Sequence, residues 1–216
     1  MDNYSIDQKL VYIGINLTSS SGDIKEGDWV DIEETIYEGS FEGVNDARVF
    51  LVLCSWIKVH GRHVIIEKLM KLQKKKKSVW LIALSHFAVS EGMLNWSRLI
   101  EKIQGEHALV PMKMAKQAAE YKGREEIFKK TGFIISKGSF RVRESDVATP
   151  LRLIERNHQY KNRFKYGANW RADIITAIEM GIENPNRISK ITGCSYPSAH
   201  RVFNEYKLVM SVDSAS

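Results

Sequence analysis

The chain has 216 residues, of which 44% are hydrophobic and 27% charged, and its net charge is +6 at pH 7. This length allows one large or two small domains, and five Trp and eight Phe argue against a disordered chain. The longest apolar runs, residues 50–56 and 79–83, are too short to span a bilayer, and the first residues lack the pattern of a signal peptide. We therefore expect no membrane partner, and the two cysteines at unrelated positions favour a reducing, cytoplasmic setting.

The charge is distributed unevenly along the chain. Residues 1–46 contain eleven acidic residues and two lysines, a net charge of −9, so the remaining residues carry +15. A basic body of this kind is typical of proteins that bind a polyanion such as nucleic acid. A solvated basic surface would explain the same excess, and the acidic segment either folds over the basic face, binds a basic partner or is mobile.

A helical pattern follows the acidic segment. Residues 10–17 alternate as in a strand, and residues 29–32 suggest another short extended piece. From residue 44 the apolar residues recur at helical spacing, with Asn45 or Asp46 as the cap of a helix that ends at Gly61. Further helices are expected over residues 63–76, 78–90 and 95–103. We expect residues 1–43 to form an acidic N-terminal segment and residues 44–120 a helical bundle.

Residues 121–167 are expected to form a basic linker region. The pattern predicts a short helix over residues 124–130, an extended pair over residues 133–136 and 139–142, and one helix over residues 150–164. Basic residues that could grip a phosphate backbone are Arg141, Arg143, Arg152, Arg156, Lys161, Arg163, Lys165 and Arg171. The interleaved aromatic residues Tyr160, Phe164 and Tyr166 are expected to pack this helix onto its neighbours rather than to stack on bases.

Residues 168–216 have the pattern of a helix-turn-helix domain preceded by a further helix. Asn184 and Pro185 begin one short helix. Gly193 supplies the turn, and Ser195 caps the next helix. The apolar face of that helix, which includes Ala199, is expected to pack back on the helix before it. The alternative is a plain three-helix bundle without a nucleic-acid partner.

The opposite face of that last helix carries hydrogen-bonding side chains of the kind that read base edges in the major groove. Basic residues flank it and can neutralise phosphates. The candidate DNA-binding residues are Tyr196, Ser198, His200, Arg201 and Asn204 for the bases, Arg187, Lys190 and Lys207 for the phosphates, and Ser195 at the helix N-terminus.

No motif supports catalysis. His60 and His63 are close in sequence, but no cysteine or acidic cluster completes a metal site with them, and a solvated turn is expected there. The four lysines at residues 74–77 suit a helix C-terminus and a solvated surface as well as nucleic acid. We therefore expect no enzyme, no catalytic residue, no metal and no cofactor.

A set of residues in the last third of the chain resembles the pattern of a known protein family. The members of the set are Asn157, Arg163, Gly167, Asn169, Arg171, Ala172 and Ile174, followed by Ile188, Gly193, Ser195, Ala199, Leu208 and Val209. With this set, and with the helical stretch over residues 47–72, the sequence resembles a bacterial family of winged helix-turn-helix transcriptional regulators. Many members are similar to antitoxins of the AbiEi kind, which repress their own operon beside a nucleotidyltransferase-type toxin. The resemblance implies a cytoplasmic bacterial repressor with a toxin or phage-defence neighbour.

The expected fold is mainly α, with an N-terminal helical bundle, a C-terminal winged helix-turn-helix domain and a few short strands. A wing needs a two-stranded hairpin, and residues 208–212 supply one strand. The second strand is missing, comes from residues 133–136, or is cut off.

The expected function is a sequence-specific DNA-binding transcriptional regulator, acting as a repressor or antitoxin. Its candidate partners are double-stranded DNA, a toxin protein and a second copy of the chain. The alternative is a protein-interaction module that neutralises or scaffolds a partner without specific DNA binding, and an enzyme of unrecognised type is a third, weaker option.

Overall fold

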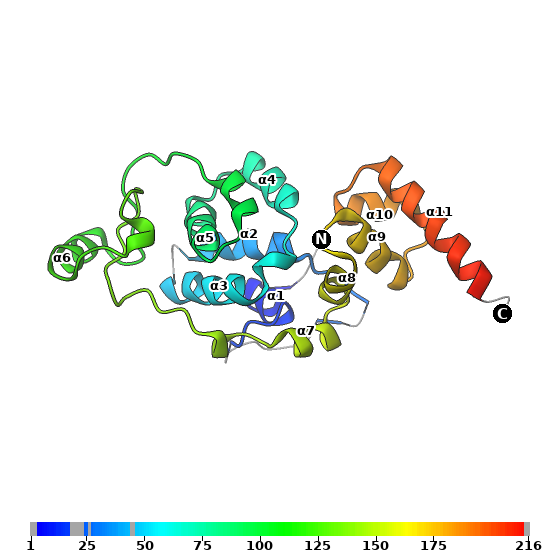
Figure 1. Ribbon diagram of the computed structural model, residues 1–216, viewed down its shortest axis with the longest axis horizontal. Helices are drawn as coiled ribbons and strands as arrows, with labels where there is room; N and C mark the ends of the chain where they lie inside the picture. Colours follow the sequence, from blue (N-terminus) through cyan, green and yellow to red (C-terminus); the bar gives the residue numbers. More distant parts are fainter. Residues whose placement is uncertain (1–3, 18–23, 26, 44–45, 214–216) are drawn as a thin grey trace.

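The computed structural model describes residues 4–17, 24–25, 27–43 and 46–213, and in this part of the chain the protein is mainly helical, as predicted (Figure 1). The α-helices are α1 (Ile6–Tyr12), α2 (Ile32–Glu42), α3 (Ala47–His60), α4 (Ile66–Lys75), α5 (Val79–Ser90), α6 (Met112–Lys122), α7 (Pro150–Arg156), α8 (His158–Tyr166), α9 (Trp170–Glu179), α10 (Pro185–Thr192) and α11 (Tyr196–Asp213). Short 3-10 helices are η1 (Gly61–His63), η2 (Leu94–Leu99), η3 (Glu126–Phe128) and η4 (Glu144–Asp146).

Extended pairing among the described residues is confined to isolated bridges, so the prediction of a few short strands is wrong. Phe133 bridges His107, and Ser136 bridges Arg124. The extended pair predicted over residues 133–136 and 139–142 therefore does not form, because each partner of residues 133–136 comes from an earlier loop. Among the same residues, no helix has both the length and the apolar character needed to cross a bilayer.

Helix α1 takes the first three of residues 10–17, where the alternation predicts a strand, and beyond the helix Ile15 forms an isolated antiparallel bridge with Val147. The side chain of Ser5 caps α1 by accepting a hydrogen bond from the backbone N–H of Gln8. Asp31 caps α2 in the same way, so Ile32 begins a helix rather than ending an extended piece. Leu10 is buried in α1. Short apolar runs do not distinguish a buried helix from a strand by periodicity alone, which accounts for the error.

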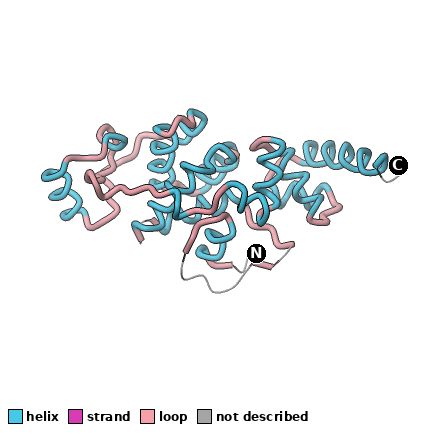
Figure 2. The backbone as a smooth tube through the Cα atoms, turned by 60° about the horizontal axis from the view of Figure 1, so that its bottom comes forward, coloured by secondary structure: helices cyan, strands magenta, loops and turns pink. Residues whose placement is uncertain are grey.

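One large apolar core joins α1–α5 with the residues that follow them. Trp56 of α3 is fully buried in it, and so is Ile36 of α2. Phe133 and Tyr160, from residues 121–167, are buried in the same core. The core therefore extends beyond the bundle expected over residues 44–120 at both ends. Helix α6 lies at the far end of the molecule from α11 (Figures 1 and 2).

Other boundaries shift by a few residues. The structure has η1 and α4 where one helix is predicted over residues 63–76, and 3-10 helices η2 and η3 where helices are predicted over residues 95–103 and 124–130. Asp46 caps α3, as one of the two predicted alternatives, and the other, Asn45, lies outside the described residues. The helix predicted over residues 150–164 divides into α7 and α8 at Asn157. The backbone of Asn157 is extended, which ends α7, and its side chain caps α8.

The last three helices pack around a second, smaller core. Ile174 of α9, Ile188 of α10 and Ala199 of α11 are fully buried in it. Gly193 ends α10 in the left-handed conformation, with φ 74° and ψ 11°, which glycine adopts without the steric cost that a side chain brings. Cys54 lies in the main core and Cys194 in the second one, and both are free thiols.

The last helix is longer than predicted. Residues 208–212, expected to form a wing strand, continue α11, which runs to Asp213 and projects from the rest of the molecule (Figure 2). In the helix the backbone groups of these residues bond within the segment, whereas a strand would need a second strand beside it. A wing hairpin is therefore not part of the described chain.

Candidate functional site

The residues predicted to contact DNA lie on α10, on α11 and in the turn between them. Ser198 is half-buried, and the other eight side chains are exposed: Arg187, Lys190, Ser195, Tyr196, His200, Arg201, Asn204 and Lys207. On the inner side of α11, Ala199 and Val202 are buried against the second core. The helix thus has one face fixed by packing and an outward face that carries polar and basic groups.

A row of side chains along α11 is held in a defined arrangement. Tyr196, His200 and Asn204 follow one another at a spacing of four residues and so share one side of the helix. The rings of Tyr196 and His200 have centroids 5.8 Å apart, and Nδ2 of Asn204 is 3.3 Å from Nδ1 of His200. At the start of the helix, Ser195 accepts a hydrogen bond from the backbone N–H of Ser198 over 3.3 Å.

Arg201 lies beside this row and is 73% exposed. Its Nε is 3.9 Å from Oε1 of Glu205. The other oxygen of that carboxylate, Oε2, is bound more closely by Nη1 of Arg171, at 2.5 Å. Exposed ion pairs of this kind contribute little to stability, so Glu205 does not hold Arg201 away from a ligand. The guanidinium of Arg201 remains available for planar, bidentate recognition.

A buried ion network connects the two cores. The guanidinium of Arg163, on α8, donates two hydrogen bonds to Glu33 of α2, at 2.5 and 2.7 Å, and two to Asp173 of α9, at 2.8 and 2.9 Å. All three side chains are fully buried. Arg163 was predicted to grip phosphate with the other basic residues of its region, and this is wrong because its five donors are turned inward.

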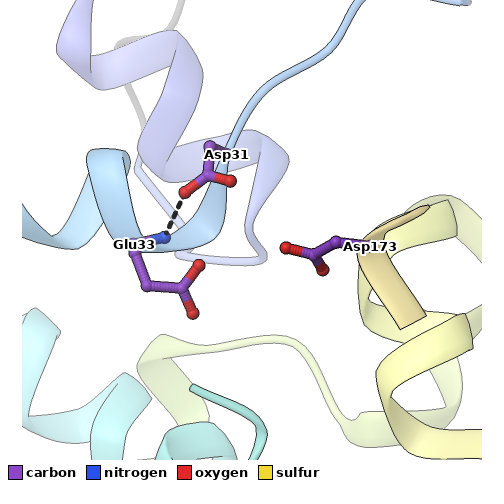
Figure 3. A group of neighbouring side chains, drawn as sticks. All are labelled: Asp31, Glu33 and Asp173. Carbon is purple, nitrogen blue, oxygen red and sulfur yellow. Dashed lines mark hydrogen bonds between the residues drawn. The ribbon is translucent and has the colours of Figure 1, made fainter. Parts of the chain in front are cut away.

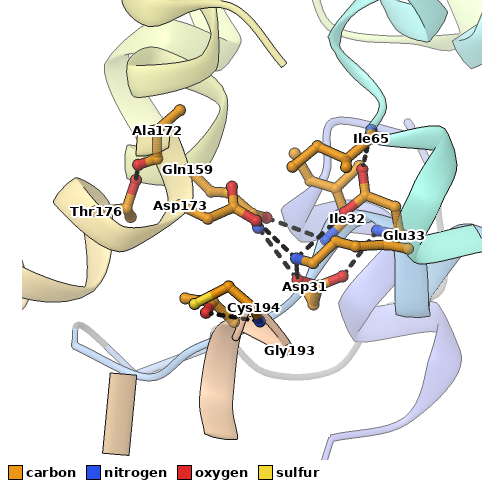
Figure 4. Close-up of polar contacts among 12 residues, drawn as sticks. Asp31, Ile32, Glu33, Ile65, Gln159, Ala172, Asp173, Thr176, Gly193 and Cys194 are labelled. Atoms are coloured by element: carbon orange, nitrogen blue, oxygen red, sulfur yellow. Dashed lines mark hydrogen bonds and ion pairs between the residues drawn. The ribbon is translucent and has the colours of Figure 1, made fainter. Parts of the chain in front are cut away.

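Lys68 of α4 completes the network. Its Nζ binds the carboxylate of Asp31, lies 2.6 Å from Asp173 and 3.5 Å from Glu33, and is enclosed by the rings of Trp29 and Trp170, at 6.0 and 5.5 Å from their centroids. Figure 4 shows the acidic members Asp31, Glu33 and Asp173 close to Gly193 and Cys194, in the turn before α11.

The three acidic side chains resemble a cation site. Asp31 and Glu33 project from the start of α2 toward Asp173 of α9, and oxygens of all three lie within 4.8 Å of one another (Figure 3). Carboxylate oxygens are the preferred ligands of hard divalent cations. Here the ammonium of Lys68 and the guanidinium of Arg163 bind the same oxygens, so the counter-charge is built into the chain and the cluster does not fit a metal site.

The network shifts the titration of its members. Burial raises the pKa of Asp31, but Lys68 and Arg163 outweigh this effect and lower it to about 2. Burial raises the pKa of Glu33 despite the same two cations. With three acidic and two basic groups, the fully ionised cluster carries one excess negative charge, and the neighbouring carboxylate of Asp31 also acts to raise the pKa of Glu33.

Sequence reasoning missed the acidic members and Lys68, although a signal was present. Asp173 stands within the apolar run of α9, between Ala172 and Ile174. Lys68 lies three residues after Ile65 and four before Leu72, on the apolar side of α4. A charged residue on the apolar side of a helix is typically paired, because an isolated buried charge is costly.

Three residues of the family-resemblance set, Asn157, Arg163 and Asn169, help to position α8 and α9 beside the ion network. Asn157 caps α8 by accepting from the backbone N–H of Tyr160, and Asn169 caps α9 by accepting from that of Ala172. Arg163 forms the centre of the ion network. Their place in the structure makes them positioning residues for the second core.

His60 is buried and not in the solvated turn that was predicted. Its Nε2 lies 2.9 Å from the backbone oxygen of Ala148, to which it donates, and its Nδ1 lies 2.8 Å from Tyr160 Oη, from which it accepts. Burial lowers the pKa of His60 to about 4, so the ring is neutral at pH 7. Of the three aromatic residues predicted to pack α8 onto its neighbours, Tyr160 is fully buried, whereas Phe164 and Tyr166 are exposed. Phe164 still stacks on the ring of the half-buried His63.

A large open hollow of about 620 Å³ is lined by residues of α1, of α3 and of the segment over residues 138–146. Its charged lining is balanced, with Arg48, Arg141 and Arg143 facing three aspartates. Balanced charge gives no preference for a polyanion, and Arg141 and Arg143 therefore do not extend the basic surface near α11.

No protein-family model, curated protein or solved structure matches the chain.

Proposed function

We propose that the protein is a sequence-specific DNA-binding regulator in which α10 and α11 form a helix-turn-helix and α11 enters the major groove. The observation that carries the proposal is the two-sided character of α11. Its inner side is packed through Ala199 and Val202, while Tyr196, His200 and Arg201 face outward. A helix fixed in this way, behind a turn at Gly193, is what a recognition helix requires.

The outward side chains suit base edges. Arg201 can bind O6 and N7 of guanine in a bidentate manner, and Asn204 can bind N6 and N7 of adenine. The exposed residues Arg187, Lys190 and Lys207 can neutralise phosphates on either side of the helix. Together they would set the register of α11 in the groove, since phosphate contacts position a protein and base contacts specify the sequence.

A narrower form of the proposal is a bacterial repressor or antitoxin of the AbiEi-like kind, with a toxin as partner. Its support is the sequence resemblance described above. The helical course of residues 208–212 departs from the winged pattern of that family, so contacts of a wing with the minor groove are not part of the proposal.

The decisive experiment is binding of the purified protein to a duplex from its own upstream region and to a scrambled duplex, at two salt concentrations. We expect the upstream duplex to stay bound at moderate salt and the Arg201→Ala variant to lose the preference. Arg48→Ala removes an exposed arginine of α3, outside the basic residues considered for phosphate binding, and is the matched control. Equal, salt-sensitive binding to both duplexes by the wild-type protein would refute sequence-specific recognition.

A protein-interaction module is the second candidate, and one observation favours it. Leu208, Val209 and Met210 are exposed by 69%, 58% and 50% at the free end of α11. Adjacent exposed apolar side chains are typical of protein-binding surfaces. The acidic N-terminal segment supports this candidate less than its composition indicates, because Asp31 and Glu33 are bound inside the protein. A Leu208→Ser variant that binds DNA normally but loses a partner in a pull-down would favour this function.

A further inference from the structure

A small basic hollow lies between α4 and α10, beside the turn that leads into α11. Its volume is about 150 Å³, roughly five times the 30 Å³ that one water molecule occupies in the liquid. Lys71 and Lys75 of α4, Lys190 of α10 and the ring of Trp170 line it, and Asp31 and Lys68 of the ion network lie at its base. The hollow is thus formed by α4, which packs in the main core, together with α10, which packs in the second core.

The lysines converge there because of their spacing. Lys68, Lys71 and Lys75 are separated by three and four residues and so lie on one side of α4. Lys68 is buried and bound by carboxylates, whereas Lys71 and Lys75 are exposed. Neither Lys75 nor Lys190 forms an ion pair with another described residue.

The charge of the hollow favours an anion. Its acidic lining residues are Asp31, which Lys68 neutralises, and the exposed Glu34. Against Glu34 stand the ammonium groups of Lys71, Lys75 and Lys190. These exposed groups carry a net charge of +2, and the excess negative charge of the fully ionised network behind them lowers this to +1. A net positive charge of this size suits a backbone phosphate, which carries one negative charge.

The hollow is placed next to the N-terminal end of α11. Nζ of Lys71 donates a hydrogen bond of 2.9 Å to the backbone oxygen of Gly193, and it lies 4.6 Å from the centroid of the Trp170 ring. Gly193 is two residues before Ser195, the cap of α11. The end of a recognition helix that approaches the bases is this N-terminal end. A duplex held there would pass its backbone close to α4.

We propose that this hollow seats a backbone phosphate of the DNA that α11 contacts, so that α4, outside the helix-turn-helix, supplies a second grip on the duplex. The inference rests on the proposed function. It assigns a shared role to Lys71 and Lys75 of α4 and to Lys190 of α10. It also places a second contact on the DNA where the described chain forms no wing hairpin.

The test compares the salt dependence of DNA binding by the full chain with that of Lys75→Gln and Lys190→Gln. Lys113→Gln, in the distant α6, removes one exposed lysine and is the matched control. We expect each of the first two variants to bind the upstream and scrambled duplexes more weakly by the same factor. In each, the slope of log K against log salt should fall by about 1, as for the loss of one phosphate contact. Lys113→Gln should keep the wild-type slope.

Two outcomes separate this inference from the proposed function. Unchanged slopes in Lys75→Gln and Lys190→Gln, with sequence-specific binding still lost in Arg201→Ala, would overturn the phosphate seat and leave the regulator intact. If the wild-type protein binds neither duplex, the proposed function and the DNA source of the phosphate fail together. Thermal unfolding with added inorganic phosphate then tests whether the hollow binds phosphate at all. A rise in Tm for the wild type that Lys75→Gln abolishes would retain the hollow as a site for a free phosphate, and no rise would refute it.

Discussion

Arg163 and Asp173 are joined side by side by two hydrogen bonds, Nε to Oδ1 at 2.8 Å and Nη2 to Oδ2 at 2.9 Å, with no solvent exposure of either side chain. The same guanidinium holds Glu33, 130 residues away in sequence. Since Glu33 belongs to α2 and Asp173 to α9, this one side chain ties the main core to the helices that carry the proposed DNA-binding face. The orientation of α11 relative to α4 therefore depends on it.

Replacing Arg163 by methionine should destabilise the protein strongly. Removing one partner of a buried ion pair leaves its carboxylates uncompensated, which typically costs about 3–5 kcal/mol. Urea unfolding at pH 7 measures this change. Arg171→Met is the control, because it removes an exposed arginine that pairs with Glu205 and should change the free energy of unfolding by less than about 1 kcal/mol. Similar, small effects in both variants would contradict the structural role of the network.

Acid should weaken the protein through His60. The ordinary pKa of histidine is 6.5 and the folded value is about 4, so between these values the unfolded chain takes up a proton that the folded protein does not. Stability is therefore lost as the pH falls from 6.5 to 4, by up to about 3 kcal/mol from this residue. Burial also lowers the pKa of His63 and His86, which adds to the same trend.

Unfolding by urea across this pH range tests the prediction with the His60→Gln variant. Glutamine cannot be protonated here, so the variant should lose part of the dependence on pH, even if its stability at pH 7 is lower. His158→Gln, at an exposed position of α8, is the control and should keep the wild-type dependence. A variant His60→Gln with an unchanged slope would show that His60 is not the responsible group.

Gly193→Ala should destabilise the turn before α11 through backbone strain and not through a clash. The nearest atoms to an added Cβ belong to Trp170, at 3.9 Å, which is ordinary contact. The φ of 74° costs a residue with a side chain roughly 1–2 kcal/mol. Thermal unfolding should show this loss, and Gly193→Asn should recover part of it because asparagine tolerates the left-handed conformation. Equal losses in both variants would argue for another cause.

Arg201 and Lys190 should differ in what they contribute to DNA binding. If Arg201 reads a guanine, Arg201→Ala should cost about 1–3 kcal/mol for the specific duplex and relax its sequence preference. Lys190→Ala should weaken binding to all sequences alike. Titration of both variants against matched and mismatched duplexes separates the two effects, and unchanged affinity in both would eliminate α11 as the recognition helix.

The sequence by itself determined the helical class and most of the C-terminal unit. Asn184 caps its helix as predicted, and Gly193 makes the left-handed turn. The exposed and buried sides of α11 also follow from its periodicity. These features depend on hydrogen bonds and side-chain spacing within a few residues, which the order of residues specifies directly.

Only the tertiary structure decided which charged and polar residues are buried. Arg163 looked like one of several surface arginines, and His60 like part of a solvated turn. Their environments are made by residues far away in sequence. Glu33, which binds the arginine, is 130 residues from it, and Tyr160, which binds the histidine, is 100 residues from it. Whether a charge is buried depends on a partner brought to it by packing, since burial without one is too costly, and no local pattern encodes that partner.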